Sequence, residues 1–123
     1  MLSSRLVIAS SLLLFAAACG SSDPSTPSPT APAPNGPAVS IPRGAEVLGN
    51  QAFQPDSLDV TAGSTVTWTN TDSVTHTSTS DNAGWNSGNI GSGKQFSVSF
   101  PTAGTFTYHC AIHPGMVGTV VVH

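Results

Sequence analysis

Apolar and polar positions alternate in short runs from about residue 39 onwards. The clearest run places Val66 and Trp68 on one face, opposite three threonines. A period of two in β-branched and aromatic residues is typical of a half-buried strand. Pro, Gly, Asn and Asp recur between such runs, and no stretch shows a sustained helical period. The pattern predicts an all-β domain folded as a β-sandwich or barrel.

The predicted strands leave one long loop. Residues 81–93 are rich in Gly, Asn and Ser, and Trp85 and Ile90 are the large apolar residues that could anchor them. His76 lies near the start of one strand-like run. The strand-like runs occupy residues 39–41, 53–60, 65–69, 74–79, 95–100, 105–110 and 118–122.

The penultimate predicted strand places a possible metal ligand, Cys110, at its C-terminal end. Tyr108 and Cys110 share one parity, so if the aromatic ring faces the core, the thiol does too. His109 then faces the opposite way and is a poor candidate for a ligand. The loop after Cys110 reverses the chain, so His113 and Met116 can turn back toward the sulfur.

One thiol, two imidazoles and one thioether make up the candidate site. Cys110, His113 and Met116 follow one another at intervals of three residues, and His76 is the available fourth donor. A thiolate and imidazoles in a trigonal arrangement, with a weak axial thioether, are the ligand set of a blue-copper centre. The sequence therefore predicts one type 1 copper ion held by these four residues.

Each of these residues also has a simpler explanation. A buried free Cys is usually a small hydrophobe, and Met116 could fill the core. His76 and His113 could be ordinary histidines. The combination favours a metal, because Cys110 and Met116 fall within one seven-residue span with a His between them. His109 and His123 are expected to be exposed and to take no part.

The N-terminal region is expected to lie outside the fold. Residues 1–18 combine Arg5, a short apolar stretch and three alanines, a pattern typical of a secretory signal peptide and too short for a membrane span. The alanines precede Cys19 as in a bacterial lipobox, which predicts lipidation of Cys19; ordinary secretory cleavage is the alternative. Residues 19–38 predict a disordered Pro/Ser/Thr-rich tether, and residues 39–123 the folded domain.

The charge of the chain argues against one class of function, and its cysteine content favours a metal site. Three Lys or Arg stand against six Asp or Glu, and so few cations argue against nucleic-acid binding. Of the two cysteines, Cys19 is expected to carry lipid, which leaves Cys110 without a disulfide partner. A lone thiol in an oxidising compartment needs another explanation, and a metal provides one.

Residues 108–122 resemble the copper loop of the plastocyanin-like cupredoxins, in the short form found in amicyanin. Residues 53–70 and 103–108 are similar to the upstream strands of that family. The resemblance implies a Greek-key β-sandwich of about eight strands with copper near one end. It implies His76, Cys110, His113 and Met116 as ligands and His113 as the electron port. Thr77 stands where many members have Asn, which leaves the hydrogen bonding around the ligands open.

The expected function is electron transfer rather than catalysis, because four protein ligands leave no open position for a substrate. Expected partners are redox proteins such as a c-type cytochrome, an oxidase or a dehydrogenase, and we expect a monomer. The location is expected to be extracytoplasmic, periplasmic or at the cell surface, with a lipid anchor at Cys19 in the outer membrane if the cell has one. The alternatives are copper delivery to an envelope oxidase and a metal-free β-sandwich surface module.

Overall fold

The computed structural model describes residues 28–29 and 35–123. The predicted signal peptide, Cys19 and most of the predicted tether lie outside these residues. Within the tether, Ser28 and Pro29 pair with Ser99 and Val98 of strand β6. No helix of the described residues is long and apolar enough to cross a membrane.

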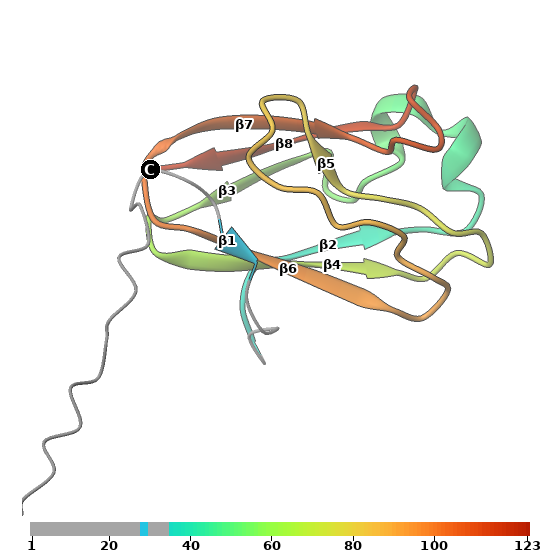
Figure 1. The fold of residues 1–123 in the computed structure, drawn as a ribbon, viewed down its shortest axis with the longest axis horizontal. Helices are drawn as coiled ribbons and strands as arrows, with labels where there is room; N and C mark the ends of the chain where they lie inside the picture. The colour runs from blue at the N-terminus through green and yellow to red at the C-terminus, as the bar shows by residue number, and fades with distance from the viewer. Residues whose placement is uncertain (1–27, 30–34) are drawn as a thin grey trace, which may run out of the picture.

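Two four-stranded sheets face each other, which confirms the predicted β-sandwich (Figure 1). One sheet has the order β1-β6-β4-β2 and the other the order β3-β8-β7-β5. The pairs β2–β4 and β3–β8 are parallel, and the remaining pairs are antiparallel. The strands are β1 (Ser28–Pro29), β2 (Ala38–Ile41), β3 (Ser57–Val60), β4 (Ser64–Asn70), β5 (Thr79–Ser80), β6 (Gln95–Phe100), β7 (Gly104–His109) and β8 (Val117–Val122).

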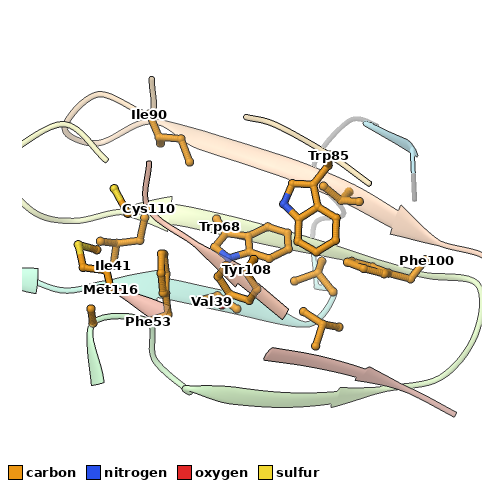
Figure 2. Close-up of a cluster of buried hydrophobic side chains, with 14 of the residues drawn as sticks. Val39, Ile41, Phe53, Trp68, Trp85, Ile90, Phe100, Tyr108, Cys110 and Met116 are labelled. Atoms are coloured by element: carbon orange, nitrogen blue, oxygen red, sulfur yellow. The ribbon is translucent and has the colours of Figure 1, made fainter. Parts of the chain in front are cut away.

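The alternation along the strands places one face of each sheet in a shared core. Val66 and Trp68 of β4 are fully buried, as their parity predicts. Trp85 and Ile90 anchor the long loop, with 4% and 2% of their surfaces exposed. The rings of Trp68 and Tyr108 pack edge to face, with 5.3 Å between their centroids. Figure 2 shows this cluster extending from Phe100 on one side to the sulfur atoms of Cys110 and Met116 on the other.

Three connections meet at the sulfur-bearing end of the sandwich (Figure 1). They are the segment between β4 and β5, the loop between β7 and β8, and two short 3-10 helices, η1 (Ala45–Val47) and η2 (Gly49–Gln51). Each connection starts from the end of a strand that hydrogen bonds hold in a sheet, namely β4, β7 or β2. Residues far apart in the sequence are thereby brought to one small volume.

Candidate metal centre

Cys110 directly follows β7 and is fully buried. Its parity with Tyr108, which is also fully buried, is as predicted. The backbone N–H of Cys110 donates to the carbonyl of Met116 (3.1 Å), and the N–H of Met116 donates to the carbonyl of His113 (2.9 Å). These two bonds close a tight loop that turns His113 and the fully buried Met116 back toward the sulfur.

His76 does not lie in a strand, contrary to the strand-like pattern of residues 74–79. Strand β5 is only Thr79–Ser80. His76 is held instead by an isolated antiparallel bridge to Ile90, with N–H to carbonyl distances of 3.2 and 2.8 Å. The bridge links the segment around His76 to the long loop that contains Ile90. The His76 side chain is fully buried.

The two imidazoles converge on the thiol. The Nδ1 atoms of His76 and His113 lie 3.9 and 3.8 Å from the Sγ atom of Cys110. For an ion of this class, bonds of about 2.0 Å to nitrogen and about 2.3 Å to sulfur that meet at about 120° would span about 3.7 Å. The three donor atoms therefore fit one trigonally bound ion. Met116 adds a buried thioether at the same end of the core.

Thr77 bridges the two halves of the centre. Its backbone N–H points at the Cys110 Sγ atom (3.3 Å), and its Oγ1 atom accepts a hydrogen bond from the N–H of Ala111 (2.8 Å). The same hydroxyl lies 2.9 Å from the hydroxyl of Thr79. The sequence had left the hydrogen bonding at Thr77 open. In the structure, the threonine ties the His76 segment to the loop that carries the thiol.

Asp72 is the residue of the centre that the sequence analysis missed. Its Oδ2 atom lies 2.9 Å from Nε2 of His76, and both side chains are buried. The hydrogen bond from His76 is the largest of the causes that hold the pKa of Asp72 well below its usual range, with backbone N–H donors adding to it and burial opposing it. Asp72 lies in a segment typical of a turn, and nothing in that pattern separates a turn aspartate from a partner of His76.

The other two histidines lie apart from the centre, as expected. His109 pairs with Asp81 on the outer face of the sheet, and His123 pairs with Asp59. A second cluster of possible metal ligands comprises Glu46, Asp72 and His76. It shares His76 with the first, and its Glu46 is exposed.

Comparison with known proteins agrees with this geometry. Residues 44–123 match the family model of copper-binding proteins of the plastocyanin/azurin family. The chain is 35% identical over 85 residues to amicyanin-alpha of Methylorubrum extorquens, which covers 61% of this chain and 67% of that protein. It is 34% identical over 97 residues to plastocyanin of Scenedesmus fuscus, covering 68% of this chain and 98% of that protein.

Solved structures give the same result. A purple cupredoxin from Nitrosopumilus maritimus superposes with a TM-score of 0.65 at 34% identity, covering 71% of this chain and 99% of that one. The Cu(I) form of a single-residue mutant of amicyanin superposes with a TM-score of 0.65 at 26% identity, covering 80% of this chain and 99% of that one. The chain belongs to the plastocyanin/azurin family of copper-binding proteins, the cupredoxins, and is a blue copper electron-transfer protein rather than an enzyme.

Proposed function

We propose that His76, Cys110, His113 and Met116 hold one type 1 copper ion, with which the protein passes single electrons between extracytoplasmic redox proteins. The observation that carries this proposal is the approach of both imidazole Nδ1 atoms to one buried thiol, at 3.8 and 3.9 Å. Thiolate and thioether favour Cu(I), whereas imidazole suits both oxidation states. Copper supplies the one-electron change, and the protein supplies a fixed set of donors.

The surrounding chain keeps these donors in place. Cys110, His76 and Met116 are fully buried, and backbone hydrogen bonds restrain the segment on each side of them. A site that cannot relax toward the preferred geometry of either oxidation state changes little when an electron arrives or leaves. That restraint favours fast electron exchange and disfavours release of the metal.

His113 is the proposed electron port. It is only partly buried, whereas His76 has no exposed surface. Exposed apolar residues lie on the connections that meet at this end of the sandwich and at the first residue of β8. Figure 1 shows where these connections meet. Such a rim suits a small and transient docking surface, and the low charge of the chain gives little electrostatic steering. These exposed residues are Val47, Leu48, Val74, Ile112 and Val117.

Export and membrane attachment complete the proposal. The sequence of residues 1–18 supports a signal peptide, and the small residues before Cys19 support lipidation there. Residues 19–38 would then connect the anchored end to the domain. The proposed location is periplasmic or at the cell surface, in the outer membrane if the cell has one. The proposed partners are a c-type cytochrome, an oxidase or a dehydrogenase.

Electron self-exchange between copies of the copper-loaded protein tests this function. We expect a reversible one-electron couple and fast self-exchange. The variant Ile112→Lys should slow the exchange, because it places a charge on the proposed docking rim of both molecules. Thr105→Lys is the matched control, since Thr105 is exposed near the other end of β7. Slow exchange in the wild type, with copper passing readily to a Cu(I) chelator, would favour copper delivery instead.

A further inference from the structure

The structure pairs an aspartate with a histidine at three places among the described residues, and one pair differs from the others. Asp59 with His123 and Asp81 with His109 are largely or partly exposed. The side chains of Asp72 and His76 are 2% and 0% exposed. A carboxylate facing an imidazole in a buried place is costly unless both groups are hydrogen-bonded. The buried Asp72–His76 pair is therefore a structural part of the metal centre.

We propose that Asp72 is a positioning residue for the copper ligand His76 and that its negative charge lowers the reduction potential of the centre. This inference rests on the proposed ligand set. It concerns a side chain that touches the ligand and not the metal.

The carboxylate of Asp72 is fixed from several directions. Its Oδ1 atom accepts the N–H of Ser73 (2.7 Å), and its Oδ2 atom accepts the N–H of Ala45 in η1 (3.4 Å). Its own N–H donates to the Oδ1 atom of Asn70 (2.9 Å). Asn70, which is fully buried, donates in turn to the carbonyls of Val74 and Ile90, each at 2.8 Å. The network links Asp72 to η1 through Ala45, and to the long loop through Asn70 and Ile90.

This fixed acceptor selects the tautomer of His76. A carboxylate 2.9 Å from Nε2 requires the proton on that nitrogen. The lone pair of Nδ1 is then free on the side of the ring that faces Cys110, 3.9 Å away. A partner that holds the second nitrogen of a ligating histidine fixes the ring orientation and raises its basicity. Asp72 thus presets His76 as a ligand before the metal arrives.

The charge has a separate consequence. A negative charge next to a ligand stabilises the more highly charged oxidation state of the metal, which is Cu(II). Burial leaves little water to screen it. Two backbone N–H groups, of Ser73 and Ala45, and the His76 ring nitrogen all point at the carboxylate oxygens, an arrangement that favours the ionised form. Removal of the charge should therefore weaken Cu(II) binding more than Cu(I) binding.

The variant Asp72→Asn separates the charge from the hydrogen bond, because the amide keeps an acceptor oxygen for His76. Loss of such an outer partner typically costs about 10–100-fold in metal affinity. We expect Asp72→Asn to weaken Cu(II) relative to Cu(I) by about tenfold. That ratio corresponds to a rise of about 59 mV in the potential of a one-electron couple. Asp59→Asn is the matched control, with the same change of charge at an exposed Asp–His pair, and should leave the potential unchanged.

Nitrogen NMR of the metal-free protein supplies a second readout. The wild type should show His76 with its proton on Nε2 at neutral pH. Asp72→Ala, which has no acceptor, should show a mixture of tautomers, and Asp72→Asn should restore the wild-type form. Far-ultraviolet circular dichroism checks that each variant is folded.

The outcomes separate this inference from the proposed function. A blue wild type whose potential is unchanged in Asp72→Asn would overturn the role of the charge. An unchanged tautomer in a folded Asp72→Ala variant would overturn the positioning role. A wild type that develops no blue colour with copper would overturn the proposed function, and the role of the charge with it.

Discussion

Thr77→Val is the change that most sharply tests the tie between the two halves of the metal centre. Valine has nearly the same shape as threonine but lacks the hydroxyl group. The variant keeps the backbone N–H that points at Cys110 Sγ. It loses the side-chain hydrogen bonds to Ala111 (2.8 Å) and Thr79 (2.9 Å). The His76 segment and the copper loop are then no longer joined by this side chain.

The structure sets the size of the effect. Thr77 is 4% exposed, so water cannot take the place of its hydroxyl without rearrangement. A typical hydrogen bond contributes about 0.5–1.5 kcal/mol net, and an orphaned buried donor costs about 1–3 kcal/mol. Ala111 is exposed and its N–H can turn to water, which favours the lower values. We expect Thr77→Val to lower the free energy of unfolding by about 1–2 kcal/mol.

Denaturant and thermal unfolding of the metal-free protein measure this loss. For a domain of this size, about 1 kcal/mol corresponds to about 4–8 °C in the melting temperature. Thr77→Ser keeps the hydroxyl and should recover most of the stability. Thr67→Val removes a buried hydrogen bond between Thr67 of β4 and Ser97, its partner on β6 in the same sheet. It should cost a similar amount and leave the copper spectrum unchanged, whereas Thr77→Val should alter both.

A stability of Thr77→Val within about 0.5 kcal/mol of the wild type, the range usual for substitutions without a structural role, would refute this reasoning. So would an unchanged copper spectrum in the same variant. The first result would mean that the hydroxyl contributes nothing to folding. The second would mean that the backbone alone fixes the copper loop.

Three further results are expected. Gly118→Ala would place a Cβ atom 2.5 Å from the Tyr108 ring and hydroxyl, and calorimetry should show that it lowers the free energy of unfolding by about 1–3 kcal/mol. The control Gly91→Ala should lower it little, because its Cβ atom would meet only a flexible side chain at 3.7 Å. Hydrogen bonds with Thr107, the largest cause, and with His109 lower the pKa of Asp81 from 3.8. The wild type should therefore be more stable than Asp81→Asn above that pH, and the difference in unfolding free energy should shrink as the pH falls below it. Copper at about 100 times its dissociation constant should stabilise the fold by about 2.7 kcal/mol, measurable as a rise in melting temperature that chelation reverses.

The sequence predicted the sandwich because its strands follow a period of two. The parity of Tyr108 and Cys110 placed the thiol in the core, and the structure agrees. Trp85 and Ile90 were predicted as loop anchors and are buried. For the residues of β4 and β7, the burial of one face of the strand was enough to fix the direction of the side chain.

Local patterns failed where long-range contacts decide the conformation. The threonines of residues 74–79 favour a strand, but only Thr79–Ser80 pair with β7. His76 is held by its bridge to Ile90, a partner in the long loop. The role of Asp72 was equally hidden, because its contact with His76 depends on how the turn after Asn70 packs against η1. Turn composition carries no information on such packing.

The central claim is that Cys110, with two imidazoles, binds copper as a thiolate. Addition of Cu(II) to the purified protein, followed by visible and electron-spin spectra, tests it most directly. The claim predicts an intense blue colour that reductant bleaches and that Cys110→Ser abolishes, while Cys110→Ser still folds. A pale spectrum without thiolate charge transfer, or an unchanged blue colour in Cys110→Ser, would contradict it.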